Sequence, residues 1–192
     1  VPITEDHPLQ GQSPYSATKI GADKLAESYY RSFDVPVVTV RPFNTFGPRQ
    51  STRAVIPTII SQCLTQEVVR LGSLTPTRDL NYVANTVAGF IAAAEVPDAI
   101  GRTINIGSGQ EISVGELANM IVRLVGRDVR IECDEERVRP GKSEVGRLLA
   151  GNALAKQLLN WTPQVEFEEG IQRTIDWFEN NVTRYRADVY SV

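Results

Sequence analysis

The stretch Ser13-Pro14-Tyr15-Ser16-Ala17-Thr18-Lys19 says more about fold and function than any other part of this 192-residue chain. Ser13 is a typical helix N-cap, and a proline is well tolerated at the first helical position, where its missing N–H costs nothing. The stretch therefore predicts the start of a helix, which we expect to run from about residue 14 to residue 33.

Tyr15 and Lys19 are four residues apart, and on a helix this spacing places both side chains on one face. The lysine ammonium favours the phenolate form of the tyrosine, so that the phenol can accept and donate a proton near neutral pH. An isolated Tyr-x-x-x-Lys is more often an ordinary surface pair. The interpretation of this pair as catalytic therefore depends on the rest of the chain.

Hydrophobic periodicity and turn residues predict an alternation of helices and strands downstream. The β-branched run Val37–Val40 suits a strand that is buried on both faces of a parallel sheet, and Ser113-x-x-Glu116 is a capping box that opens a helix. Strands are expected at residues 37–41, 68–71, 80–83, 103–106 and 129–132, and helices at residues 54–66, 85–95, 114–125, 152–159 and 167–180.

Five further motifs follow the tyrosine–lysine pair in order. They are Pro42-Phe43-Asn44-Thr45-Phe46-Gly47-Pro48-Arg49, Arg78-Asp79-Leu80-Asn81-Tyr82-Val83, Asn105-Ile106-Gly107-Ser108-Gly109, Arg139-Pro140-Gly141-Lys142 and Leu159-Asn160-Trp161-Thr162-Pro163. With these motifs the chain closely resembles the extended short-chain dehydrogenase/reductase family, and within it the nucleotide-sugar epimerases and 4,6-dehydratases. The resemblance covers roughly residues 8 to 180.

This resemblance implies an α/β fold, namely the C-terminal part of a doubly wound, Rossmann-like parallel sheet plus a smaller α/β lobe that binds the substrate. Residues 1–50 would be the last part of the NAD-binding domain. Residues 51–182 would form mainly the nucleotide-sugar lobe, with residues 80–106 crossing back to the sheet, and residues 183–192 would be a tail.

Members of the family begin with a strand and a glycine-rich turn that receives the cofactor pyrophosphate at a helix N-terminus. No such turn precedes Tyr15. We therefore expect the chain to be the C-terminal part of a longer enzyme, and to neither retain NAD nor show activity by itself. An incomplete sheet should also leave an apolar face exposed and favour self-association.

The resemblance also assigns roles to residues around the NAD cofactor. Tyr15 would take the proton from the sugar 4-hydroxyl, and Lys19 would bind the nicotinamide ribose. Pro42 and Phe43 would lie near the nicotinamide amide, and Asn44 would donate to the sugar or its phosphate.

For the nucleotide diphosphate, the resemblance points to arginines, because a doubly charged group removed from water needs charged partners. Arg78 and Arg139 are the candidates, with Arg137 and Lys142 flanking the second. Arg49 is a further candidate, although Arg53 could play the same part.

The reaction itself stays open between several outcomes of oxidation at sugar carbon 4. The segments Leu9–Tyr15 and Gly72–Asp79 look most like UDP-N-acetylglucosamine 4,6-dehydratases of the legionaminic acid type. This favours 4,6-dehydration of a UDP-sugar over 4-epimerisation. The remaining alternatives are decarboxylation, a reductase of the same family, and a nucleotide-sugar-binding module without chemistry. The resemblance also implies a homodimer.

Composition excludes several other classes. The net charge is −3 and no block of lysine or arginine occurs, which argues against a nucleic-acid partner. No apolar run approaches the roughly 18–20 residues of a membrane-spanning helix. Cys63 and Cys133 lack metal-ligand or redox spacing, so we expect no metal site, reduced cysteines and a cytoplasmic location.

Overall fold

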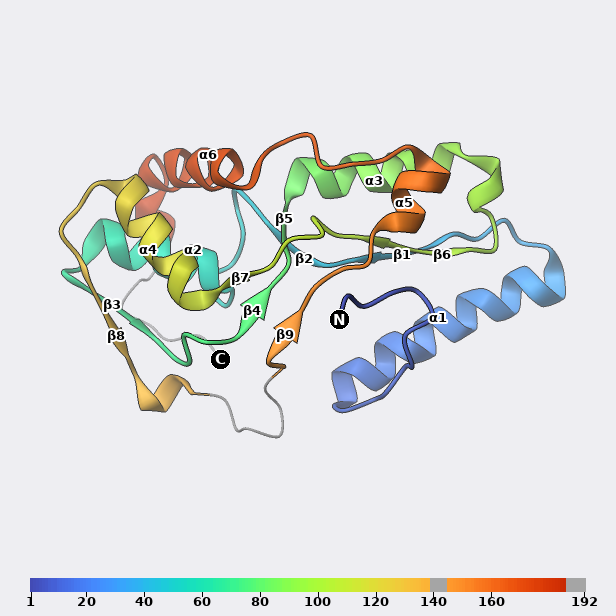
Figure 1. The fold of residues 1–192 in the computed structure, drawn as a ribbon, viewed down its shortest axis with the longest axis horizontal. Coiled ribbons are helices and arrows are strands. Elements are labelled where there is room, and N and C mark those ends of the chain that lie inside the picture. The colour runs from blue at the N-terminus through green and yellow to red at the C-terminus, as the bar shows by residue number, and fades with distance from the viewer. Residues whose placement is uncertain (139–144, 186–192) are drawn as a thin grey trace.

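The computed structural model describes residues 1–138 and 145–185. At its centre β1 (Thr39–Pro42) and β6 (Thr103–Ile106) pair in parallel, from Thr39 opposite Thr103 to Pro42 opposite Ile106. Helix α1 covers one side of this pair, whereas α3 and α5 cover the other (Figure 1). The expected α/β architecture, a parallel sheet with helices on both faces, is confirmed.

Helix α1 (Pro14–Phe33) has the bounds that the sequence predicts. The Ser13 hydroxyl accepts a hydrogen bond from the Ser16 amide at 3.2 Å, and the Ser16 hydroxyl accepts one from the Ser13 amide at 2.9 Å. These reciprocal bonds satisfy two N–H groups that a helix N-terminus leaves without partners. The helix ends at Asp34, whose left-handed backbone (φ 53°) directs its N–H to the Tyr30 carbonyl.

The other elements form the lobe and its connection to the sheet. β2 pairs with β5 and β3 with β8, both in parallel, whereas β4 lies between antiparallel β7 and parallel β9. Their bounds are β2 Asn44–Phe46, α2 Val55–Thr65, β3 Val68–Leu71, β4 Thr77–Arg78, β5 Leu80–Tyr82, α3 Val83–Glu95, β7 Ile112–Ser113, α4 Val114–Val125, β8 Arg130–Cys133, β9 Arg147–Leu148, α5 Ala153–Leu159 and α6 Phe167–Glu179, with short 3₁₀ turns at Pro97–Ala99, Glu135–Arg137 and Val182–Arg184.

The buried side chains form two clusters. The larger joins α2, α4 and α6 to the lobe strands and contains Phe46, Ile60, Leu117 and Phe178. The smaller lies between the β1–β6 pair, α3 and α5, and Trp161 belongs to it. Helix α5 therefore packs with the sheet, although the sequence suggested only residues 80–106 as the segment that returns there.

One expectation about the first strand is wrong. β1 begins two residues later than expected, and Thr39, Val40 and Arg41 are half-buried rather than buried on both faces. Among the described residues β1 pairs only with β6, so it is an edge strand with one side open. The other expected elements are found within about two residues of their bounds, as is usual for assigned helix and strand ends.

Apolar side chains are exposed on both helical layers, whereas the sequence led us to expect an exposed apolar face on the incomplete sheet. On α1, Leu25, Tyr29 and Phe33 are 61%, 51% and 70% exposed, at a spacing of four residues that places them in one row. On α3, Phe90 and Ile91 are about half exposed. Such rows mark surfaces that another element or chain covers.

A wholly buried carboxylate ties the two parts of the fold together. One oxygen of Asp79 accepts hydrogen bonds from the Ser108 amide (2.8 Å) and hydroxyl (2.6 Å), and the other accepts from the amides of Gly109 (2.9 Å) and Ala150 (3.0 Å). Asp79 follows β4, Ser108 and Gly109 follow β6, and Ala150 precedes α5. Three segments far apart in the chain thus converge on one charge.

We predict that Asp79→Asn lowers the free energy of unfolding by about 2–6 kcal/mol, because at least two buried N–H donors lose their acceptor at about 1–3 kcal/mol each. Urea unfolding followed by circular dichroism measures the change. Asp128→Asn, at an exposed position, is the matched control and should have little effect. Equal stability of the two variants would contradict the structural role given to Asp79.

Candidate functional site

A large cleft, of about 780 Å³, opens in the lobe among β2, α2, β3 and β4. Of the described residues, four arginines from separate segments line it together with one carboxylate, Glu136, so this part of its lining is positive. The arginines are Arg53, Arg70, Arg78 and Arg137. Asn44 and apolar side chains, among them Leu80 and Leu148, complete the wall. A concave, basic surface with an apolar side suits an anionic ligand that also has a flat or apolar part.

Backbone carbonyls orient Arg78, the sequence candidate for phosphate binding that the structure describes best. Its Nη1 donates to the carbonyls of Thr77 (2.8 Å) and Val145 (2.7 Å). Val145 lies just before β9, which pairs with β4 along its parallel edge. The position of this guanidinium therefore depends on the β4–β9 pairing.

Arg137 and Arg70 come from the β3–β8 side of the cleft. The Arg137 Nε donates to the Asp134 carboxylate at 3.0 Å, and its Nη1 donates to the Arg70 carbonyl at 3.3 Å. The buried amide of Gln62, on α2, bonds both the N–H and the carbonyl of Arg70 at 2.8 and 3.2 Å. The Gln62 amide thus makes the two backbone hydrogen bonds that a neighbouring strand would make, and it fixes the backbone that carries the Arg70 side chain.

The structure distinguishes between Arg49 and Arg53 as candidates for binding the phosphates. Arg49 is exposed, has a left-handed backbone (φ 70°) and does not line the cleft, whereas Arg53, just ahead of α2, does. Arg139 and Lys142 lie outside the described residues. Sequence reasoning gave Arg70 no role, and it could have been found only through its place at the middle of β3, because no motif marks it.

Tyr15 and Lys19 are brought together on one face of α1, as their spacing predicts. The Lys19 Nζ lies 5.9 Å from the centre of the Tyr15 ring, and the tyrosine is 71% exposed. Neither residue lines the large cleft. In Figure 1 the N-terminal end of α1, which carries both, lies toward the side of the molecule where β9 and β4 are drawn.

The end of β1 connects the sheet to the cleft. The Phe43 amide donates to the Ile106 carbonyl at 2.9 Å, which extends the β1–β6 pairing by one bond. Pro42 is exposed, and the next residue after Phe43, Asn44, starts β2 and lines the cleft. The carboxyl end of a parallel strand, where such sheets bind their ligands, is thus continuous with the arginine-rich wall.

A clamp beside Arg78 was not predicted from the sequence. Glu111 accepts a hydrogen bond from the Thr77 hydroxyl at 2.5 Å and forms an ion pair with Arg147 of β9. The Arg147 guanidinium first, and the Thr77 hydroxyl second, lower the pKa of the Glu111 carboxyl to about 2. Since side chains alternate between the faces of a strand, the clamp holds β4 by Thr77 while Arg78 faces the cleft.

Cys63 and His7 are weak candidates for a catalytic role. Burial raises the pKa of the Cys63 thiol to about 11, which keeps it protonated and unreactive. His7 is exposed and lines a separate pocket beside α1. Within residues 1–138 and 145–185, no group of three or more His, Cys, Asp or Glu side chains is arranged to hold a metal ion, and no helix is long and apolar enough to cross a membrane.

Comparison with known proteins gives consistent matches over almost the whole chain. A family model described as GDP-mannose 4,6 dehydratase matches residues 1–174. The low-salt glycan biosynthesis protein Agl12 of Haloferax volcanii is 35% identical over 178 residues, which are 92% of this chain and 56% of that protein.

Solved structures agree with this result. The X-ray structure of Pal from Bacillus thuringiensis is 37% identical with a TM-score of 0.85, covering 93% of this chain and 57% of that one. UDP-glucuronic acid 4-epimerase from Bacillus cereus, in complex with UDP-glucuronic acid and NAD, is 27% identical with a TM-score of 0.86, covering 94% and 57%. The chain thus spans somewhat more than half the length of the relatives it matches.

The Glu111 clamp predicts a pH-dependent contribution to stability. Because the folded-state pKa is lowered from 4.5 to about 2, the contribution is fully present above pH 4.5 and is lost as the pH falls toward 2. Glu111→Gln should therefore lower the Tm near neutral pH, and its difference from the unsubstituted protein should shrink as the pH is lowered through this window. Glu168→Gln, which breaks an exposed pair with Arg123, is the control. A Tm difference for Glu111→Gln that does not vary with pH would contradict the clamp.

Proposed function

The chain belongs to the GDP-mannose 4,6 dehydratase family of extended short-chain dehydrogenases/reductases, and from this membership we propose that it modifies a nucleotide sugar by transient oxidation at sugar carbon 4. The reaction we favour is 4,6-dehydration of a UDP-sugar by the protein that contains this chain. The cleft would bind the nucleotide diphosphate, and the end of α1 would supply the acid–base group.

The observation that carries the proposal is the arginine-rich cleft at the end of the parallel strands. Among the described residues of its lining, four guanidinium groups against one carboxylate favour a multiply charged anion, and arginine forks match phosphate oxygens in shape and charge. In our assignment Arg78 and Arg53 contact the diphosphate, and Asn44 contacts the sugar or its adjacent phosphate.

On α1, Tyr15 accepts the proton of the sugar 4-hydroxyl as carbon 4 is oxidised, and returns it later. Lys19 lies one turn away, with its Nζ 5.9 Å from the centre of the Tyr15 ring, and its ammonium can donate to ribose hydroxyls. The high exposure of Tyr15 leaves the phenol accessible to a sugar.

NAD is the cofactor that we propose for the complete site, as the sequence resemblance implies. The residues described here fit its nicotinamide end, because Lys19 offers donors to ribose hydroxyls and the strand end at Pro42 and Phe43 is half-open. The 192 residues do not include a glycine-rich turn ahead of α1 for the pyrophosphate. When bound, NAD would accept hydride from carbon 4.

Two alternatives share this geometry. A 4-epimerase would need the same cleft and the same tyrosine, and one of the similar structures is of a UDP-glucuronic acid 4-epimerase in complex with UDP-glucuronic acid and NAD. A binding module without chemistry would need the cleft alone, and the separation of Tyr15 from the cleft lining is the observation that favours it. Turnover of a nucleotide sugar by the complete protein that contains this chain, loaded with NAD, distinguishes an enzyme from a binding module.

We further propose that the protein is a homodimer that buries the apolar row Leu25, Tyr29 and Phe33 of α1. Each of these side chains is at least half exposed in the single chain. A row of this length along one helix suits antiparallel packing against the same row of a second copy.

Arg78→Ala should weaken UDP binding by about 1.5–3 kcal/mol, the scale of a hydrogen bond to a charged group. Titration calorimetry with UDP and with uridine separates the phosphate contact from a general effect on folding, since uridine affinity should not change. Arg49→Ala, outside the cleft lining, should leave both affinities unchanged. An equal loss of uridine affinity in Arg78→Ala would assign the residue a structural role instead.

Tyr15→Phe should lower kcat for the nucleotide sugar by about 10²–10⁴, because only the acid–base proton is lost, while nucleotide-sugar affinity stays the same. Steady-state kinetics and calorimetry on the NAD-loaded protein measure the two quantities. Tyr29→Phe, an exposed tyrosine on the same helix, is the control. Turnover of Tyr15→Phe at the rate of the unsubstituted protein would remove the assignment.

A further inference from the structure

Helix α1 carries a row of polar side chains spaced by four residues: Tyr15, Lys19, Asp23 and Glu27. Side chains at this spacing lie on one face of a helix, each about one turn beyond the last. Tyr15 and Lys19 are the proposed acid–base pair, so Asp23 is the next group along the same face.

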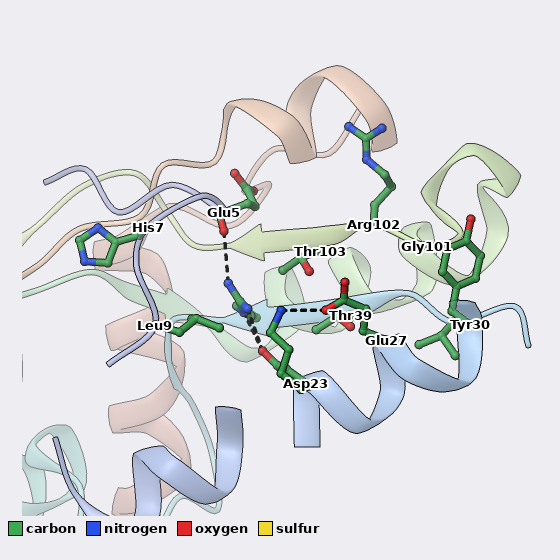
Figure 2. Close-up of a pocket in the computed structure, with 13 residues that line it drawn as sticks. Glu5, His7, Leu9, Asp23, Glu27, Tyr30, Thr39, Gly101, Arg102 and Thr103 are labelled. Carbon is green, nitrogen blue, oxygen red and sulfur yellow. Dashed lines mark hydrogen bonds and ion pairs between the residues drawn. The ribbon is translucent and has the colours of Figure 1, made fainter. Parts of the chain in front are cut away.

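Asp23 is bonded to the central strand rather than to its own helix. Its Oδ2 accepts a hydrogen bond from Nε of Arg41 at 2.9 Å and forms an ion pair with Nη2 of the same guanidinium, also at 2.9 Å; both side chains are only about one quarter exposed. In Figure 2, Asp23 on α1 and Glu5 in the N-terminal segment lie on either side of the guanidinium to which both are bonded. The Arg41 Nη1 donates to the Glu5 carbonyl at 3.4 Å.

The Arg41 guanidinium also holds the N-terminal segment that leads into α1. The Glu5 carboxylate accepts a hydrogen bond from the Asn105 amide on β6 at 2.9 Å, while the Glu5 carbonyl faces Arg41. Arg41 thus connects three parts of the molecule: strand β1, helix α1 and the N-terminal segment. A partly buried ion pair with two short contacts from one guanidinium contributes more to stability than an exposed pair, because water screens it less.

Helix α1 has few other contacts that could set its position. None of its residues is fully buried, so no apolar side chain anchors it in a core. Near its C-terminal end the ring of Tyr30 lies against Gly101, where an added Cβ would be 2.4 Å from ring atoms. Tyr30 and Asp23 are seven residues, about two turns, apart on the helix. A directional contact at Asp23 and a steric contact at Tyr30 therefore both oppose sliding of α1 along its axis.

Arg41 also directly precedes Pro42 and Phe43, the strand end that leads to Asn44 in the cleft. We propose that Asp23 and Arg41 are positioning residues, which hold the tyrosine–lysine face of α1 at the correct height relative to the end of β1. Asp23 is one helical turn from Lys19, so a shift at the ion pair is transmitted rigidly to the acid–base pair. This inference rests on the proposed function of Tyr15 and Lys19.

The chain contains a matched control for this pair. Glu27, one turn further along the same face, forms ion pairs with Lys24 and Arg31 at 2.7 and 2.8 Å. Those partners are on α1 itself, and the strand is not involved. Glu27→Gln removes a carboxylate and ion pairs from the same helix face without touching the connection to β1.

The test compares Asp23→Asn, Arg41→Gln, the double variant and Glu27→Gln in the NAD-loaded protein. A displacement of about 1 Å at a reacting group can cost about 100-fold in rate, so we expect kcat to fall by about 10- to 100-fold in each single variant while KM changes little. The double variant should be no slower than the slower single one, because both remove the same contact. Asp23→Glu should restore part of the rate, and Glu27→Gln should keep it.

Hydrogen exchange gives a second readout that does not need turnover. Amides in the first three turns of α1 should exchange faster in Asp23→Asn than in Glu27→Gln. An unchanged kcat in Asp23→Asn, or equal exchange in the two variants, overturns the positioning role. If the unsubstituted protein turns over no nucleotide sugar, the proposed function fails. The comparison of amide exchange in Asp23→Asn and Glu27→Gln then still decides whether the Asp23–Arg41 pair holds helix α1.

Discussion

The buried carboxylate of Asp79 is the interaction on which the rest of the structure depends. A charge removed from water is tolerated only when it is fully paired, and here three backbone amides and one hydroxyl supply that pairing. The donors come from the turn after β6 and from Ala150, three residues ahead of the start of α5, whereas the carboxylate belongs to the strand region that carries Arg78. The sheet and the lobe cannot move apart here without leaving this charge unpaired, so the arginine-rich wall keeps its place beside the end of the parallel strands.

The site follows from how single strands pass between the two hydrophobic clusters. β1 belongs to the sheet, and after Phe43 the chain continues directly as β2 on the lobe, where Asn44 lines the cleft. β4 and β5, on either side of Asp79, both lie in the lobe, and Asp79 between them bonds to the turn after β6. In our proposal, Asn44 for the sugar and Arg78 for the phosphates are therefore attached to strands that meet in the lobe. Helix α1, which carries the proposed acid–base pair, is attached differently, by the Asp23–Arg41 pair and by Tyr30 against Gly101.

Local signals made much of the fold predictable. The caps at Ser13 and Ser113 and the periodicity of each helix depend on residues within one or two turns, and the structure has them as expected. The contacts that build the site are not local. Asp79 finds its partners 29 to 71 residues away, and Arg41 finds Asp23 18 residues away. Arg53 lines the cleft and Arg49 does not, and the left-handed backbone at Arg49 was not evident from the sequence. The Tyr15–Lys19 pairing was predictable because it lies within a single helix.

We propose that the cleft and the end of α1 act on one substrate, with the diphosphate at Arg78 and the sugar at Tyr15. A crystal structure of the complete, NAD-loaded protein with a UDP-sugar bound tests this. We expect the sugar 4-hydroxyl oxygen at about 2.6–3.2 Å from the Tyr15 phenolic oxygen, the range needed for proton transfer, with phosphate oxygens bonded to the Arg78 guanidinium. A diphosphate bound at Arg78 with its sugar directed away from Tyr15, beyond hydrogen-bond reach, would contradict it.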